Sequence, residues 1–415
     1  MATPLSPRYN AGMRTGAFVT GLALIPLLAC GHSDDDSKGD ETYALAPSSI
    51  WVDKGTQKEV GQFASLAADS HGMPHISYYD YSNRSLKYAY LKDNVWQTET
   101  VDSEGDVGQF TSLVMDSNDH PHIVYYDASN DELKYAYFTG TKWRRIVFYA
   151  DHGGLFASLA LDEKNRSHVA FVSRSDYALH YGTWDAVRAT SAPTDQILSD
   201  GVLSLPNPMA GALTGGVSLK IRPQSLTPIV AYYHASLGTL ENQRRESADG
   251  CKSPYLSATG YCTTVVDGGE TIGERHDVGR DVSLFVAGEN DWHVSYYDAT
   301  NQALKYAHWD EEHSRWLVEV VDEEGDVGRY SSITVVCHGD GTTDCRPFIS
   351  YFDATNNDLK VATRGPNKPW VTFRADSAGN TGGYTSIGFL RQGRIGVAYH
   401  DFTHAELKFR LIPPF

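Results

Sequence analysis

Acidic side chains recur at one position of a repeated pattern in this chain, two residues before a glycine. They are Glu59, Asp106, Asp277 and Asp326. If the loops that carry them are equivalent and meet at one end of the molecule, several carboxylates together are able to bind Ca²⁺ or another cation. The alternative is structural, because an acidic side chain at such a position also accepts hydrogen bonds from backbone N–H groups and caps its own turn.

Most candidate ligand-binding residues lie at positions where one copy of the pattern differs from the other copies. A residue that recurs in most copies is expected to build the scaffold, whereas a residue found in one copy is the better candidate for contacting a ligand. Two arginines that follow the glycine in neighbouring copies are added because they are expected on the same loop face. The candidates are Arg174, His234, Arg280, Arg329, His400, Asp401 and His404. They form no convincing catalytic pair, so no catalytic residue is assigned.

Seven serines, each followed by Leu or Ile, recur at another position of the pattern. They are Ser65, Ser112, Ser158, Ser218, Ser283, Ser332 and Ser386. No Ser-His-Asp arrangement selects one of them as a nucleophile. A small hydroxyl side chain that bonds neighbouring backbone suits a place where strands converge on an axis, so we expect the serines to be structural.

The serines mark seven copies of one phrase, which continues with a turn, a Tyr-Tyr-Asp run and a leucine six residues later. A period of roughly 45 residues built from short strands is typical of propeller blades. In the first copy we expect strands at 64–68, 75–80, 86–91 and 96–101, because Tyr, Val, Ile and Thr dominate these segments and Gly, Asn, Asp and Pro separate them. The chain is therefore predicted to be all-β, a seven-bladed β-propeller of four-stranded antiparallel blades.

The two ends of the chain predict how the ring closes. Few residues follow Phe409, so the seventh copy lacks a fourth strand of its own. Residues 49–53 resemble the Trp-containing fourth strands of other copies. We therefore expect an N-terminal strand to complete the last blade, which hides strand edges that promote aggregation. The propeller is predicted to span residues 51–415.

Two further recurring sets are interpreted as scaffold. Four hairpins pair an Asp with an Asn three residues later, as a tight turn requires: Asp80/Asn83, Asp127/Asn130, Asp298/Asn301 and Asp353/Asn356. Five aromatic residues fall two positions after the glycine: Phe63, Phe110, Phe156, Tyr330 and Tyr384. We expect the aromatic residues to pack between blades, and a stacking surface for sugars is the alternative.

The N-terminal segment reads as an export signal. Arg8 and Arg14 precede an apolar run that ends in Leu-Leu-Ala-Cys at Cys30. This ending resembles a bacterial lipobox, so residues 1–30 are predicted to be a lipoprotein signal peptide with Cys30 lipidated; an ordinary cleaved signal is the alternative, and Met13 competes with Met1 as the start. Residues 31–48 are predicted to be a flexible acidic tether. The expected location is the bacterial cell envelope, with the protein lipid-anchored in the outer membrane. The propeller then faces either the periplasm or the cell surface.

Four cysteines remain for the propeller. Cys251 and Cys262 flank one loop, and Cys337 and Cys345 flank another. Two local disulfides are the simple interpretation in an oxidising compartment. Zinc is the alternative for these cysteines, but no His/Cys pairing at ligand spacing accompanies them.

The formal net charge is −17. Nucleic acid requires a basic stripe, so this balance argues against it and favours neutral or cationic partners, Ca²⁺ included. The chain is expected to be a monomer.

The repeated Ser-Leu, Pro-His-Ile-x-Tyr-Tyr-Asp and Leu-Lys-Tyr-Ala segments resemble the sialidase-like, or BNR-like, β-propeller repeats of bacterial surface and secreted proteins. The resemblance covers the chain from about residue 51 to its end and implies the fold. True sialidases resemble a six-bladed ring with Ser-x-Asp-x-Gly-x-x-Trp boxes and an arginine triad. Those boxes are absent here, and Arg174, Arg280 and Arg329 are the arginines expected to share a face.

Two functions follow from these observations. The first is a lipid-anchored propeller, facing the surface or the periplasm, that binds a glycan or protein ligand without catalysis. The alternative is a glycoside hydrolase or polysaccharide lyase, sialidase-like, acting at the mouth of the propeller channel. A pair of catalytic residues at non-repeating positions would favour the enzyme.

Overall fold

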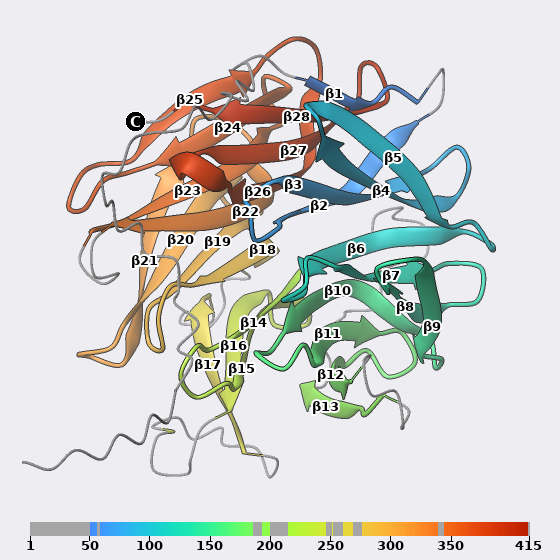
Figure 1. Cartoon of the computed structure of the whole chain (residues 1–415). Coiled ribbons are helices and arrows are strands. Elements are labelled where there is room, and N and C mark those ends of the chain that lie inside the picture. Colours follow the sequence, from blue (N-terminus) through green and yellow to red (C-terminus); the bar gives the residue numbers. More distant parts are fainter. Residues whose placement is uncertain are drawn as a thin grey trace, which may run out of the picture.

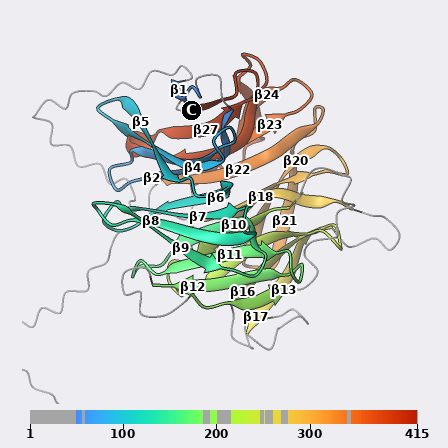
Figure 2. The ribbon, with the colours of Figure 1, turned by 90° about the vertical axis from the view of Figure 1, so that its right-hand side faces the viewer.

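The computed structural model describes residues 50–55, 59–185, 193–199, 215–245, 251, 260–268, 276–338 and 344–413. Within them the chain folds into seven four-stranded antiparallel sheets. Each innermost strand contacts the innermost strands of the two neighbouring sheets, so the sheets form a closed ring around an axis (Figures 1 and 2). The predicted seven-bladed β-propeller is confirmed.

Blades are numbered 1 to 7 from β2 to β28. The innermost strands are β2 (Val60–Ala68), β6 (Val107–Met115), β10 (Gly153–Leu161), β14 (Val217–Ile221), β18 (Val278–Val286), β22 (Val327–His338) and β26 (Thr381–Phe389). The second strands are β3 (Pro74–Asp80), β7 (Pro121–Asp127), β11 (Ser167–Ser173), β15 (Pro228–His234), β19 (Trp292–Asp298), β23 (Asp344–Asp353) and β27 (Ile395–Asp401). A single 3₁₀ turn among the described residues, η1 (Arg391–Gly393), joins β26 to β27.

The third strands are β4 (Ser85–Lys92), β8 (Glu132–Phe138), β12 (Leu179–Trp184), β16 (Thr239–Arg245), β20 (Ala303–Asp310), β24 (Asp358–Thr363) and β28 (Glu406–Ile412). The outer strands are β5 (Val95–Asp102), β9 (Trp143–Tyr149), β13 (Gln196–Ser199), β17 (Tyr261–Asp267), β21 (Arg315–Asp322), β25 (Val371–Asp376) and β1 (Ile50–Asp53). The strands of blade 1 occupy the expected segments, although β2 begins earlier than expected.

The ring closes through the N-terminal strand. β1 pairs antiparallel with β28, and Ile50 lies opposite Phe409. Val52 and Val60 share one buried cluster with Leu407 and Phe409, so the first and last blades are packed together. The predicted closure is confirmed.

The seven serines bind neighbouring blades to one another. Each hydroxyl oxygen accepts a hydrogen bond from a backbone N–H on the innermost strand of the next blade, at 2.9 to 3.1 Å. The last bond, from the Leu66 N–H to Ser386, joins blade 1 to blade 7. A complete ring of equivalent bonds is a structural role, as expected from the recurrence of these residues.

Ion pairs lock several blade interfaces farther from the axis. In blade 6, the Tyr351 hydroxyl donates to Asp322 of the preceding blade at 2.6 Å, and Lys360 pairs with the same carboxylate. Equivalent groups centre on Asp53, Asp102, Asp267 and Asp376. Buried charges are tolerated when they are paired and hydrogen-bonded in this way.

Candidate functional site

Six innermost strands carry a bulge at the end of the ring where the channel mouth was expected. The register of each strand against its neighbour shifts there, and the bulged residue has φ between 50° and 54°. The six residues are Phe63, Phe110, Phe156, Asp281, Tyr330 and Tyr384. Positive φ is strained for bulky side chains, and such strain persists only where the surroundings enforce it.

Five of these residues form an arc of aromatic rings around the channel. Neighbouring ring centroids are 4.6 to 4.9 Å apart from Phe156 through Phe110, Phe63 and Tyr384 to Tyr330. In blade 4 the arc is broken by Gly215, where a Cβ atom would lie 2.4 Å from the Phe156 ring. The rings therefore do pack between blades, as expected.

Asp281 is the charged member of this ring of positions. Its carbonyl oxygen accepts a hydrogen bond from the Ser331 hydroxyl at 2.7 Å, which holds the bulge. Burial raises the pKa of the Asp281 carboxyl to about 6, although the Tyr330 backbone, Arg280 and Arg329 favour its ionised form. A half-buried carboxyl with a raised pKa beside a tyrosine is able to exchange a proton near neutral pH.

The acidic residues predicted to bind Ca²⁺ each make local contacts. Asp277 pairs with Arg280 and accepts a hydrogen bond from Tyr233, and Asp326 pairs with Arg329 and accepts one from Tyr297. Asp106 accepts a bond from the Tyr79 hydroxyl, and Glu59 one from Gln62. None of the four belongs to the groups of three metal-ligating side chains found among the described residues. Calcium at these acids stays a prediction.

In these contacts the four carboxylates accept from side chains and not from backbone N–H groups, so capping of their own turns by the acids stays a prediction. The Asp106, Asp277 and Asp326 N–H groups each donate to a Ser or Thr hydroxyl of a hairpin between the second and third strands, at 2.7 Å. The loops that precede the innermost strands and the hairpins between the second and third strands therefore lie together on one face.

The remaining candidate residues are spread over this loop face. Arg174 is half exposed, with its guanidinium 3.5 Å from the Tyr126 hydroxyl and 3.9 Å from Asp131. His400 is buried and its Nδ1 is 2.9 Å from the Val60 carbonyl. Burial lowers the pKa of His400, so the ring is neutral.

Asp401 and His404 form a hairpin turn. The Asp401 carboxylate, which is fully buried, accepts hydrogen bonds from the His404 backbone and imidazole and pairs with Lys408. His404 thus takes the place of the Asn in the recurring Asp/Asn turns, whose bonds have the same geometry in blade 1. His234 is also buried, and its Nδ1 has no hydrogen-bond partner among the described residues.

A cleft of about 260 Å³ lies between blades 3 and 4, away from these residues. Its volume is close to the lower end of small-molecule sites, about 300 Å³. Tyr181 and Tyr261 are buried and form its floor with His168. The other lining residues are Arg166, Thr183, Thr194, Asp195, Gln196, Leu226, Thr227, Pro228 and Arg245.

Two residues that are smaller than their counterparts in several other blades open the cleft. Thr183 lies opposite His168 across β11 and β12. The residues at the equivalent position opposite a histidine in blades 1, 2 and 5 are larger: Tyr90, Tyr137 and His308. Tyr261 lies opposite Arg245 at the start of β17. The equivalent position of blades 1, 2, 5 and 6 carries tryptophan: Trp96, Trp143, Trp316 and Trp370.

Elsewhere the tryptophan fills the space between blades. Trp143 packs on Tyr88 of the preceding blade with ring centroids 5.4 Å apart, whereas Tyr261 and Tyr181 are 6.3 Å apart. The cleft is therefore the consequence of two replacements that remove aromatic volume from one interface.

The floor and rim of the cleft offer different contacts. Burial raises the pKa of the Tyr181 phenol and lowers that of His168, so both groups are neutral hydrogen-bonding partners. Arg166 and Arg245 are exposed at the rim. Asp195, also at the rim, is 3.0 Å from the buried His180 imidazole, which offsets its charge. The cleft suits a polar, uncharged or anionic small ligand.

Three residues of the candidate sites, Asp281, Thr183 and Tyr261, were not among the residues predicted from the sequence, although signals for them exist. Asp281 falls two residues after Gly279, in register with five aromatic residues, so alignment of the copies reveals it. Thr183 and Tyr261 appear only when the cross-strand registers of different blades are compared.

Both predicted disulfides are present, Cys251 with Cys262 and Cys337 with Cys345. Cys30, the signal peptide and the tether lie outside the described residues. Among those that are described, no helix has the length and apolar character needed to cross a membrane.

No protein-family model and no curated protein matches the chain. Solved structures similar to it include the lectin of Aleuria aurantia, a six-bladed β-propeller described as recognising fucose. That lectin is 12% identical over 85% of this chain and 91% of its own chain, with a TM-score of 0.45. The Hadza microbial sialidase Hz136 is 10% identical over 88% of this chain and 68% of that one, with a TM-score of 0.49. The polysaccharide lyase Uly1 is 9% identical over 84% of this chain and 88% of that one, also with a TM-score of 0.49.

Proposed function

We propose that this chain is a glycan-binding β-propeller without catalytic activity, and that its ligand occupies the cleft between blades 3 and 4. The observation that carries the proposal is the loss of aromatic volume at one blade interface, through Thr183 and Tyr261 together, at positions that larger aromatic residues fill in blades 1, 2 and 5. An opening made by residues that differ from the repeat is better explained by a ligand than by the scaffold.

The chemistry of the cleft favours a carbohydrate. Tyrosine rings present an apolar face and a polar hydroxyl, which suits a sugar ring with hydroxyl groups at its edge. Arg166 is already paired with Asp162, so Arg245 is the rim residue that favours a sugar bearing a carboxylate, because guanidinium groups bind carboxylates with paired hydrogen bonds. We include lipidation at Cys30 in the proposal, so that the propeller is displayed at the cell envelope.

A second candidate function, glycan cleavage, rests on Asp281. A carboxyl with a pKa of about 6 at the channel mouth is suited to act as a general acid. Glycoside hydrolases generally use two carboxyl groups. The acids nearest in the loop pattern, Asp277 and Asp326, are paired with Arg280 and Arg329, so binding is the better supported function.

A glycan array tests the proposal with a variant that closes the cleft. In Thr183→Tyr/Tyr261→Trp, both substitutions introduce the residue type that other blades carry at the same position, so the fold is expected to be retained. The wild-type chain should bind acidic glycans and the double variant should lose at least tenfold in affinity.

Asp281→Asn serves as the matched control at the second site. Unchanged binding by Asp281→Asn together with loss of binding by the double variant supports the cleft. Release of reducing ends or unsaturated sugars that disappears in Asp281→Asn would instead assign an enzyme at the channel mouth.

A further inference from the structure

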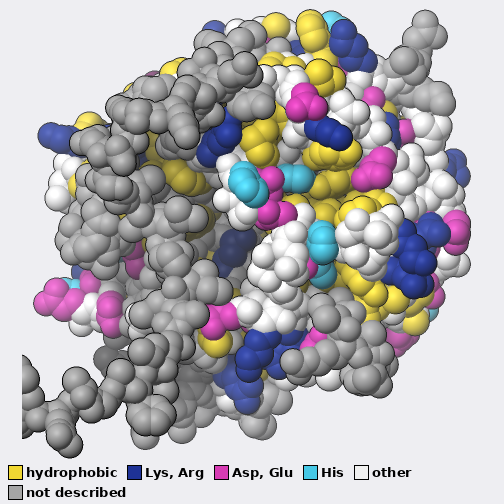
Figure 3. Space-filling model, viewed as in Figure 1, with side chains coloured by type: hydrophobic (Ala, Val, Ile, Leu, Met, Phe, Trp, Pro, Cys, Tyr) yellow, Lys and Arg dark blue, Asp and Glu magenta, His cyan; other side chains and the backbone are white. Residues whose placement is uncertain are grey.

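Asp–His–Tyr groups recur in the blades. In blade 2, the Nδ1 of His122 is 2.6 Å from the Tyr135 hydroxyl and its Nε2 is 3.6 Å from Asp116. Blades 1 and 3 contain the same group around His75 and His168. Histidine and acidic side chains are also neighbours on the face of the molecule drawn in Figure 3.

In blades 1 to 3 the acid is part of a turn. Asp116 precedes His122 by six residues, and its carboxylate accepts hydrogen bonds from the Asn118 and His120 N–H groups at 2.8 Å. The carboxylate therefore has a structural task, and the histidine Nε2 lies 3.4 to 3.6 Å from it in blades 1 to 3.

Blade 5 departs from this arrangement. Its acid, Asp291, stands two residues before His293, so both side chains are on the same face of one extended segment. His308 lies directly opposite His293 across β19 and β20. The equivalent residues of blades 1 and 2 are Tyr90 and Tyr137, so blade 5 has gained a second imidazole.

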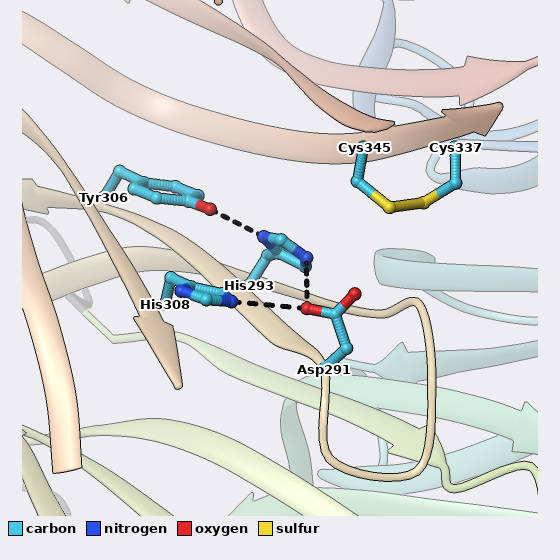
Figure 4. Close-up of a disulfide and its surroundings, with 6 residues drawn as sticks. All are labelled: Asp291, His293, Tyr306, His308, Cys337 and Cys345. Atoms are coloured by element: carbon cyan, nitrogen blue, oxygen red, sulfur yellow. Dashed lines mark hydrogen bonds and ion pairs between the residues drawn. A yellow bond between two sulfur atoms is a disulfide. The ribbon is translucent and has the colours of Figure 1, made fainter. Parts of the chain in front are cut away.

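The three side chains converge (Figure 4). Asp291 Oδ1 is 2.9 Å from His293 Nε2 and 3.3 Å from His308 Nε2. Ligand atoms held about 2.0 to 2.1 Å from a zinc ion at tetrahedral angles stand about 3.3 Å from one another. The two separations from Asp291 match this spacing within about 0.4 Å, and all three ligand atoms lie within 4.8 Å of one another.

His293 is prepared for a ligand on Nε2. Its side chain is 6% exposed, and its Nε2, although close to Asp291, lacks the geometry of a hydrogen bond. Its other nitrogen, Nδ1, is 2.6 Å from the Tyr306 hydroxyl. Metal-bound histidines are oriented by such a partner on the second nitrogen.

The surroundings of the group leave one side accessible. The Asp291 and His308 side chains are 30% and 37% exposed, which leaves room for water or another ligand. The nearby Cys337 and Cys345 are joined in a disulfide and are not thiolate donors (Figure 4). Arg364, a cation that stacks on Tyr306, is paired with Glu319.

We propose that Asp291, His293 and His308 bind a zinc ion at the edge of blade 5, with one coordination position open to solvent or to a ligand. Imidazole and carboxylate are established zinc ligands, and two histidines with one carboxylate leave an open position. None of the three residues lines the cleft between blades 3 and 4, so this site is independent of the proposed glycan function.

The test is calorimetric titration of the metal-free mature chain with Zn²⁺, together with the visible spectrum of the Co²⁺-loaded chain. We expect one zinc ion to bind per chain and Co²⁺ to give the intense absorption of tetrahedral coordination. His308→Tyr, which restores the residue of blades 1 and 2, and Asp291→Asn should each weaken zinc binding more than 100-fold. Tyr306→Phe should weaken it about 10- to 100-fold, as loss of an orienting partner does.

His71→Ala is the matched control. His71 belongs to the other group of metal-ligating side chains found in the described residues, with Asp69 and Asp119, and its side chain is 77% exposed. The proposal requires this variant to bind zinc as the wild type does. Absence of zinc binding, or equal binding by the wild type, His308→Tyr and Asp291→Asn with unchanged melting curves, would overturn it.

Discussion

Asp322 offers a quantitative test of the ion pairs between blades. Asp322, Tyr351 and Lys360 are 6%, 0% and 7% exposed. The Asp322 carboxylate accepts a hydrogen bond from the tyrosine hydroxyl and forms an ion pair with the lysine ammonium. In Asp322→Asn the amide oxygen still accepts from Tyr351, but the buried ammonium loses its counter-ion. Removal of one partner of a buried pair costs about 3 to 5 kcal/mol. Asp353, 3.9 Å from Lys360, compensates in part, so we expect about 3 kcal/mol.

Thermal unfolding measures this loss. An unfolding entropy of about 2.1 cal/mol/K per residue over roughly 360 residues makes 3 kcal/mol a decrease of about 4 °C in Tm. The double variant Asp322→Asn/Lys360→Met removes both charges. Its decrease in Tm should be smaller than the sum of the decreases caused by Asp322→Asn and Lys360→Met separately. Arg315→Ala, which breaks an exposed pair with Asp310, is the control and should not change Tm measurably. A Tm for Asp322→Asn within about 1 °C of the wild type, or additive effects of the single variants, would show that the Asp322–Lys360 pair does not stabilise this blade interface.

Three further outcomes are expected. Because the folded-state pKa of Asp281 is raised from 3.8 to about 6, the wild type should lose stability as pH rises through this interval, and Asp281→Asn should show a flatter dependence in melts between those pH values. Replacing Cys337 and Cys345 by serine should lower the free energy of unfolding by about 2.5 kcal/mol, since the closed loop is short; an unchanged denaturation midpoint would contradict this. Cys30→Ala should move the protein from the membrane fraction to the soluble fraction, whereas unchanged fractionation would exclude a lipid anchor on that cysteine.

The scaffold was predictable from the sequence because its residues recur. Seven serines at one position imply seven equivalent environments, and each does bond the next blade. Recurrence also distinguishes the hairpin turns, in which Asp401 and His404 repeat the geometry of Asp80 and Asn83. The strand boundaries were less accurate, since β2 continues through a bulge at Phe63 whose positive φ no propensity indicates.

The candidate sites were harder to predict because they depend on pairs of residues far apart in the sequence. Asp291 and His308 meet only through the register of β19 against β20. Tyr261 stands out only when it is aligned with the tryptophans at the same outer-strand position of other blades. That alignment cannot be made from the sequence without knowing the lengths of the loops between the third and fourth strands. Asp281 is different, because a closer alignment of the sequence copies would have found it.

Glycan binding in the cleft is tested most directly by the affinity of one acidic glycan from the array for the wild-type chain and for Thr183→Tyr/Tyr261→Trp, measured by calorimetry at one salt concentration. We expect stoichiometric binding to the wild type and a loss of at least tenfold in the variant, with both proteins melting at similar temperatures. Equal affinity of the two proteins would contradict this expectation and would locate the ligand outside the cleft between blades 3 and 4.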